Sequence, residues 1–222
     1  MANEYMMVSS ITNVLGQAKD CLVDLGESWI DAQLDDGLLK EIPIIKTLML
    51  GKNVIRTVTE CHEIRQISQF LLTIDTECTD EARRKRYVKV LNENAKQFEK
   101  ELEYVTIVVT NYLESEKPKM LGRLYLKRLD GGLSWDEFAK YAAAIDRIFP
   151  TDVERLKEHD FKKNAIMCKQ SESEEILRLI SVGFMYEQSV SYLMGNDLSE
   201  TTDHEIPYSI TAFGQKFIDI VG

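Results

Sequence analysis

The residues best suited to acid–base chemistry are the neighbours Glu158, His159 and Asp160. An imidazole beside carboxylates is typical of sites that donate and accept protons. This triplet lies at the end of a short expected helix, next to Lys162 and Lys163. A solvated polar helix end explains the pattern more simply, so we predict no catalytic site here.

Cysteine and histidine are the residue types most often used to bind metals. The four cysteines are widely spaced, form no Cys-x-x-Cys motif and fit a reducing compartment; they are Cys21, Cys61, Cys78 and Cys168. Cys61 and His62 are adjacent, but neighbours on a helix point about 100° apart and rarely share one ion. We therefore predict neither a metal site nor a cofactor.

Motifs that hold phosphates or activate nucleophiles are missing from the sequence. It contains no Walker phosphate loop, no GxGxxG, no GxSxG and no HExxH. The acidic pair Asp35-Asp36 falls in a turn and has no obvious chemical partner. We predict a non-enzymatic protein, and the alternative is an active site assembled from dispersed residues.

Charge is distributed unevenly along the 222 residues, which carry a net charge of −10. Segments 1–36 and 131–222 are acidic, whereas 37–130 is basic. The strongest basic run is Arg83-Arg84-Lys85-Arg86 with Lys89, which reads as a solvated helix face or as a contact for an anionic partner. Overall acidity disfavours nucleic acid and anionic membranes unless a local basic face overrides it.

Segment 1–36 is predicted to form an acidic helix. Its apolar residues recur every three or four positions, as in a coiled-coil seam: Val8, Ile11, Leu15, Ala18, Leu22, Leu25 and Trp29. The seam packs either on this chain or on a second copy, which would make a homodimer. Met1–Ser10 lacks Lys and Arg and so lacks the layout of a signal peptide, and we expect a cytoplasmic location.

Leu38–Val58 is the most apolar stretch, and Pro43 favours a helix start there. The same helical period continues through Ile64–Ile74, as one helix over 43–75 or as two with a break near Cys61. Charges at Lys40, Glu41, Lys46 and Lys52 interrupt every window long enough to span a membrane. We predict a buried core helix; the alternatives are a membrane-active amphipathic helix and a partner-binding surface.

The remainder of 37–161 is predicted to complete a helical bundle. Thr79 can cap the next helix. The β-branched run Val105–Thr110 could form a strand, but its flanks favour a helix over 99–114. Further helices start near Ser115–Pro118 and at the capping boxes Ser134-x-x-Glu137 and Thr151-x-x-Glu154, and Asp130-Gly131-Gly132 ends the first of them. A loop at 162–171 is the expected domain boundary.

Segment 171–222 has a different pattern. Ser171 caps a helix that ends at Gly183, strands follow at 184–194 and 206–210, and Thr211 caps a last helix. The order LRLISVGFMYE … YSITAFGQKFIDI resembles the end of a winged-helix domain, which implies a helix, a two-stranded wing and a closing helix. Together with IPIIKTL and the helices after it, this tail is similar to a group of uncharacterised bacterial and phage helical proteins. That similarity implies a prokaryotic or phage source and no particular activity.

The charges of this tail argue against DNA binding. No Lys or Arg occurs between Leu179 and Gln215, whereas Glu187, Asp197, Glu200, Asp203 and Glu205 are acidic. A wing on DNA needs cations to contact phosphates. A protein-contact or structural role is therefore predicted in its place, with a winged-helix DNA-binding regulator as the alternative.

The sequence thus predicts a mainly α protein, a multi-helix bundle with a small C-terminal α+β winged-helix-like module. Its domains are 1–36, 37–161 and 171–222. Its predicted function is protein–protein interaction; the candidate contact residues are Leu15, Leu22, Leu25, Trp29, Arg83, Arg84, Arg86, Glu187, Asp197 and Asp203.

Overall fold

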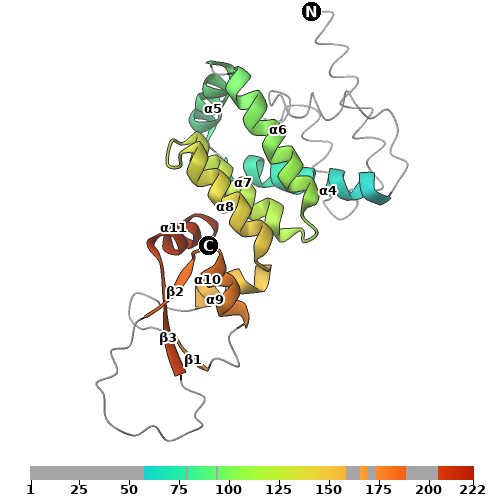
Figure 1. Ribbon diagram of the computed structural model, residues 1–222. Helices are drawn as coiled ribbons and strands as arrows, with labels where there is room; N and C mark the ends of the chain where they lie inside the picture. Colours follow the sequence, from blue (N-terminus) through green and yellow to red (C-terminus); the bar gives the residue numbers. More distant parts are fainter. Residues whose placement is uncertain (1–57, 79, 94, 159–165, 170–173, 189–204) are drawn as a thin grey trace, which may run out of the picture. The chain divides into compact units, whose positions relative to one another are not determined.

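The computed structural model describes residues 58–78, 80–93, 95–158, 166–169, 174–188 and 205–222. Helices predominate in this part of the chain, and a small antiparallel sheet lies near the C-terminus (Figure 1). The predicted fold class, mainly α with a small C-terminal α+β module, is confirmed. The expectations for Leu38–Thr57 and for the helix at 1–36 fall outside the described residues.

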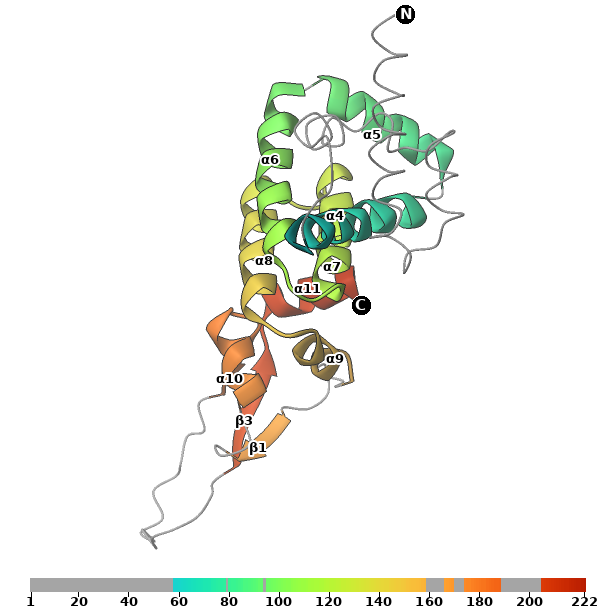
Figure 2. The same cartoon turned by 90° about the vertical axis from the view of Figure 1, so that its right-hand side faces the viewer.

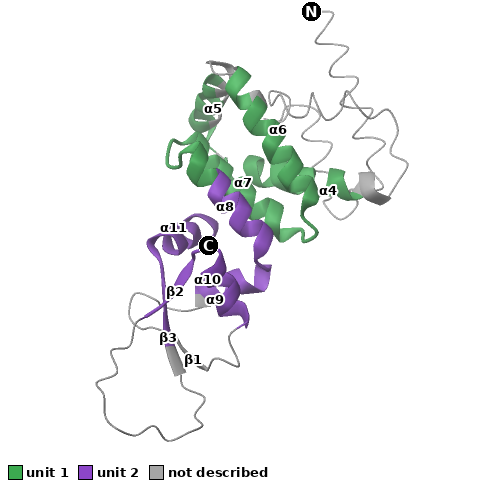
Figure 3. Cartoon of the chain, viewed as in Figure 1, with its two compact units in different colours: residues 1–138 green, residues 139–222 purple. Residues whose placement is uncertain are grey.

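The chain divides into two compact units, residues 1–138 and 139–222 (Figure 3). The division falls inside helix α8 (Trp135–Arg147), whose first residues belong to unit 1 and whose remainder belongs to unit 2. The predicted boundary, at 162–171, lies later in the chain.

Unit 1 is helical wherever it is described. Its helices are α4 (Val58–Glu77), α5 (Glu81–Glu93), α6 (Ala95–Asn111), α7 (Glu116–Leu129) and the start of α8. α4 packs against both α6 and α7 (Figure 2). Because α4 runs through Cys61 without interruption, the alternative with a helix break near Cys61 is wrong.

Two helix starts in unit 1 are fixed by side-chain caps. Ser134 and Glu137 form the predicted capping box, with Ser134 Oγ accepting from the Glu137 N–H at 3.2 Å and Glu137 Oε2 accepting from the Ser134 N–H at 2.8 Å. At α5 the predicted cap, Thr79, lies outside the described residues. The helix begins two residues later, and the Asp80 carboxylate accepts from the Ala82 N–H at 2.9 Å.

Aromatic side chains fill much of the core of unit 1. Tyr125 packs against Phe70 and Phe138, with ring centroids 5.8 and 5.6 Å apart. In α6, Val105 and Val109 are buried while Ile107 is 56% exposed. This four-residue period of burial belongs to a helix, so the helical interpretation of the β-branched run is confirmed.

Unit 2 combines helices with the sheet. After α8 come α9 (Pro150–Glu158), β1 (Ile166–Lys169), α10 (Glu174–Ser181), β2 (Met185–Glu187), β3 (Glu205–Ile210) and α11 (Ala212–Val221). β3 lies between β1 and β2 and is antiparallel to both, with Ile166 opposite Tyr208 and Met185 opposite Ile210.

The predicted β2–β3 hairpin is therefore confirmed, but the prediction of a loop over 162–171 is wrong where β1 occupies it. The four residues of β1 are too few to show a periodic pattern. Their extended conformation is supported by antiparallel pairing with the distant strand β3, from Ile166 opposite Tyr208 to Lys169 opposite Glu205.

The core of unit 2 is a cluster of stacked aromatic rings. Tyr141 stacks on Phe213 with centroids 4.2 Å apart, and Phe184 stacks on Phe217 at 4.5 Å. Tyr141 also donates its hydroxyl to the Phe213 carbonyl at 3.1 Å. Thr211 Oγ1 accepts from the Gly214 N–H at 2.9 Å, which confirms the predicted cap of the last helix.

Gly214 allows α11 to approach the start of β2 closely, and substitution at this position tests that packing. A Cβ at this position would lie 2.3 Å from the Phe184 carbonyl oxygen, which is backbone and cannot move aside. We expect Gly214→Ala to lower the free energy of unfolding by about 1–3 kcal/mol, measured by urea denaturation followed by circular dichroism. At Gly132 an added Cβ meets only the flexible Lys127 side chain, so Gly132→Ala is the matched control. Equal losses in the two variants would contradict the packing argument.

Candidate interaction site

A buried ion pair holds helix α10 to helix α9. The Asp152 side chain is 0% exposed, and its two oxygens accept from Arg178 Nη2 at 2.8 Å and from Arg178 Nε at 3.0 Å. One of the same oxygens also accepts from the Phe149 N–H at 2.9 Å. A buried carboxylate needs such partners, because an unpaired charge in the interior is strongly destabilising. The pair therefore fixes α10 on α9.

The contacts of Asp152 also correct the expected start of α9. The helix begins at Pro150, a favoured first position, rather than after a cap at Thr151. Asp152, not Glu154, reaches back to the residue before the helix and satisfies its free N–H. Glu154 instead pairs with Lys157 at 3.1 Å.

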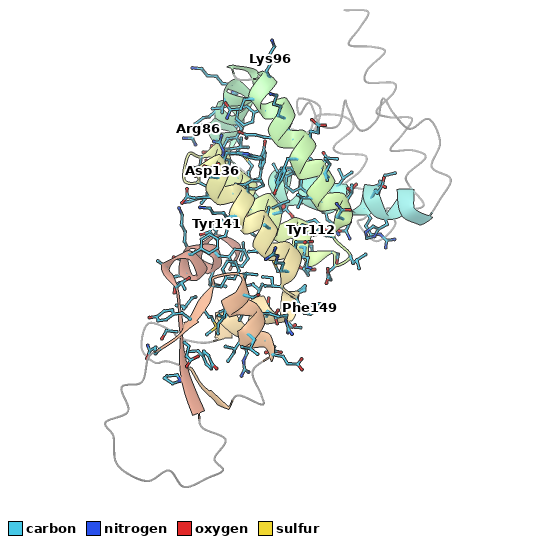
Figure 4. The ribbon with its side chains drawn as sticks, in the orientation of Figure 1. Arg86, Lys96, Tyr112, Asp136, Tyr141 and Phe149 are labelled. Atoms are coloured by element: carbon cyan, nitrogen blue, oxygen red, sulfur yellow. The ribbon has the colours of Figure 1, made fainter. Side chains whose placement is uncertain are left out.

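Arg178 is the one cation in the sequence of α10, and its guanidinium is held by Asp152 while the side chain stays 29% exposed. The hydrogen bonds to Asp152 raise the pKa of Arg178 above its ordinary value, so it remains charged. On its other side the guanidinium lies 4.9 Å from the centroid of the Phe149 ring, within cation–π range. Phe149 stands at the junction of α8 and α9 (Figure 4).

The exposed side of α10 consequently has little positive charge. Glu174, Leu177 and Ser181 follow one another at spacings of three and four, so they share a helix face, and all three are exposed. Leu177 is 54% exposed. Elsewhere in unit 2, Phe149 and Tyr186 are also large exposed apolar side chains, at 50% and 46%. An acidic and apolar face suits contact with protein rather than with phosphates.

A groove lies on unit 2 between α8, the end of α10 and α11. It is open to solvent, with a volume of about 460 Å³, and is lined by Lys140, Ala143, Ala144, Arg147, Ser181, Val182 and Phe213. The four residues from α8 are spaced i, i+3, i+4 and i+7 and form one stripe of that helix. Small apolar residues form the centre of the stripe, and cations stand at its two ends.

The structure describes only some of the predicted contact residues. Glu187 is exposed at the end of β2. Arg84 lies within α5, and Arg86 is exposed on the same helix. Six more of the predicted contact residues fall outside the described residues: Leu15, Leu22, Leu25, Trp29, Asp197 and Asp203.

Arg83 has a structural contact that the sequence analysis did not predict. It pairs with Asp130 at the end of α7, donating from Nε at 3.3 Å, and Tyr87 donates its hydroxyl to the same carboxylate at 2.7 Å. Burial by itself would raise the pKa of Asp130, but the hydrogen bonds from Arg83 and Tyr87 outweigh it and hold that pKa below its ordinary value. Arg83 thus joins α5 to α7, whereas Arg86 remains exposed.

Sequence reasoning missed the residues that build the site in unit 2. Asp152 and Arg178 are twenty-six positions apart, and no local pattern pairs them. Lys140, Ala143, Ala144 and Arg147 did carry a signal, because their spacing marks a second helix stripe beside the apolar one. The apolar stripe was recognised, and the basic one was not.

Metal binding and membrane insertion find no support in the described ranges. No three His, Cys, Asp or Glu side chains there are grouped so that they could hold a metal ion. Among the helices described, none has the length and apolarity needed to cross a bilayer.

The chain matches no protein-family model, no curated protein and no solved structure.

The Asp152–Arg178 pair predicts a specific stability defect. We expect Arg178→Met to lower the free energy of unfolding by about 2–4 kcal/mol, because the Asp152 carboxylate stays buried without its counter-ion. Adding Asp152→Asn should restore part of this loss. Urea denaturation of the single and double variants measures both effects.

Arg155 provides the control for this experiment, since it lies 3.9 Å from Glu175 and both side chains are about half exposed. Arg155→Met should change the free energy of unfolding by less than about 0.5 kcal/mol. A double variant no more stable than Arg178→Met would contradict the assignment.

The hydrogen bonds from Arg83 and Tyr87 to Asp130 predict that the free energy of unfolding depends on pH. Because the folded-state pKa of Asp130 is lowered, its stabilising effect is full above the unfolded pKa of about 3.9 and is lost as pH falls through the folded value. Wild type should therefore be more stable than Asp130→Asn at neutral pH, and the difference should shrink below about pH 4. Denaturation curves at several pH values test this, and a difference that stays constant down to pH 2 would refute it.

Proposed function

We propose that the protein is a non-enzymatic interaction module that binds a protein partner through the exposed face of α10 in unit 2. The observation that carries this proposal is the engagement of Arg178. Its guanidinium is held by the fully buried Asp152, so the face offers Glu174, Leu177 and Ser181 to a partner. An exposed leucine on a helix fixed by a buried ion pair is a preorganised apolar contact.

Charge supports the choice of protein over nucleic acid. A winged-helix-like module that binds DNA would need cations on the helix and wing to contact phosphates. Arg178 is the one basic residue in the sequences of α10, β2 and β3. The same elements contain four acidic residues: Glu174, Glu175, Glu187 and Glu205. The acidic ends and basic middle of the chain further favour electrostatic selection of a protein partner.

Three other predictions remain proposals on sequence grounds. Homodimerisation through the seam at 1–36 and membrane binding by 38–58 both depend on residues outside the described ranges. A cytoplasmic location in a bacterium or in phage-infected cells completes the proposed setting, in which the module acts on other proteins.

The test is a quantitative pull-down with the full chain from bacterial lysate, comparing wild type with Leu177→Glu. We expect the variant to reduce recovery of the specific partner at least roughly tenfold, because a buried apolar contact is replaced by a desolvated charge. Ile107→Glu is the matched control, since Ile107 is about equally exposed but lies in unit 1. Thermal unfolding should show that both variants remain folded.

Two outcomes would refute the proposal. One is a wild-type chain that recovers no partner above a bead control. The other is a low-salt gel shift of DNA that Leu177→Glu does not affect, which would favour the DNA-binding alternative.

A further inference from the structure

Helix α8 has two stripes in unit 2, and the second one has no assigned role. Tyr141, Ile145 and Ile148 form the first stripe and are buried. Lys140, Ala143, Ala144 and Arg147 form the second, and they line the groove of about 460 Å³ together with Ser181, Val182 and Phe213. A stripe with small apolar residues at its centre and a cation at each end is complementary to a surface with an apolar centre and an acidic group at each end.

The dimensions of this stripe match one helix laid against another. Seven residues of α-helix rise about 10.5 Å, or close to two turns, so Lys140 and Arg147 point from the same side of α8 at its two ends. Ala143 between them is exposed and projects only a methyl group, which allows close approach of a second backbone; Ala144, which also lines the groove, is only 4% exposed. Phe213 and Val182, both partly exposed, provide an apolar wall across the groove.

The two cations of the groove are not used by the described part of unit 2. Neither Lys140 nor Arg147 has an ion pair or side-chain hydrogen bond with a described residue. Other basic residues of the unit are engaged: Arg178 with Asp152, Lys157 with Glu154, and Arg155 near Glu175. The groove thus carries two cations that form no ion pair with a described residue, although unit 2 is acidic as a whole.

We propose that this groove binds an amphipathic helix of a partner protein, with carboxylates two turns apart that pair with Lys140 and Arg147. An apolar side chain between those carboxylates would lie on Ala143 and Phe213. The inference rests on the proposed function, that unit 2 binds proteins, and adds the class of partner. Ser181 lies both on the exposed face of α10 and in the groove lining, so the two surfaces are continuous.

A compact anion such as phosphate fits the groove less well. The groove reaches the C-terminal end of α10, where the helix dipole places negative partial charge. The Ser181 hydroxyl already donates to the Arg178 carbonyl at 2.7 Å. Carboxylates separated along a helix reach Lys140 and Arg147 individually, at the two ends of the stripe, and leave the apolar centre to apolar side chains.

The test uses a yeast-displayed library of helical peptides sorted for binding to the full chain. We expect the enriched peptides to carry Asp or Glu at positions seven apart with an apolar residue between them. Binding should fall at least roughly tenfold for the double variant Lys140→Glu, Arg147→Glu, because two attractions become repulsions. It should also weaken as NaCl rises from about 0.05 to about 0.5 M.

The control is Arg155→Glu with Lys157→Glu, which changes the same number and sign of charges on α9 of the same unit. This control should bind the peptides about as well as wild type, and denaturation curves should show both double variants folded. A library that yields no binders, binders without paired acids, or equal losses in the two double variants would overturn the inference.

The remaining outcomes separate this inference from the proposed function. Peptides that lose binding to Leu177→Glu but not to the groove variant would overturn the groove and leave the proposed function standing. Self-association of the wild type, abolished in the groove variant when measured by light scattering, would make a second copy the occupant and overturn the assignment to a partner protein.

Discussion

The ion pair between Asp152 and Arg178 is the interaction on which the described surface of unit 2 depends. A carboxylate with no solvent exposure requires a counter-ion, and the guanidinium provides two aligned hydrogen bonds. The pair places α10 on α9 and at the same time engages the one cation of α10, whose side chain remains 29% exposed. A single contact thus positions the helix and engages its one cation.

Stacked aromatic rings form the core of unit 2. Tyr141, Phe184, Phe213 and Phe217 bring α8, the start of the wing and α11 together, and Thr211 ties them by accepting from Gly214 and donating to the Gly183 carbonyl. Rings packed in this way have few alternative arrangements. The groove beside them is therefore a feature of a well-packed unit, with Phe213 belonging both to the core cluster and to the groove wall.

The resemblance of the C-terminal segment to a winged helix would suggest DNA, whereas the charges of its described elements favour the proposed contact with protein. The wing strands are short and carry Glu187 and Glu205, and the helix before them exposes Glu174 and Leu177. Function follows from the chemistry of a site rather than from the fold that bears it. Lys140 and Arg147, two cations without an ion pair to a described residue, lie on α8, where their spacing suits a helix better than a nucleic-acid backbone.

Local signals in the sequence determined the helices, the Ser134 capping box, the Thr211 cap and the β2–β3 hairpin, because hydrogen bonds and apolar spacing within a few residues favour them. The strand β1 depended on tertiary structure, since its four residues become a strand through pairing with distant β3. The same holds for the Asp152–Arg178 pair, the engagement of Arg83 by Asp130, and the groove: each joins residues from different elements. Sequence spacing sets which residues share one helix face, whereas only the packed chain decides which of those faces remain open to a partner.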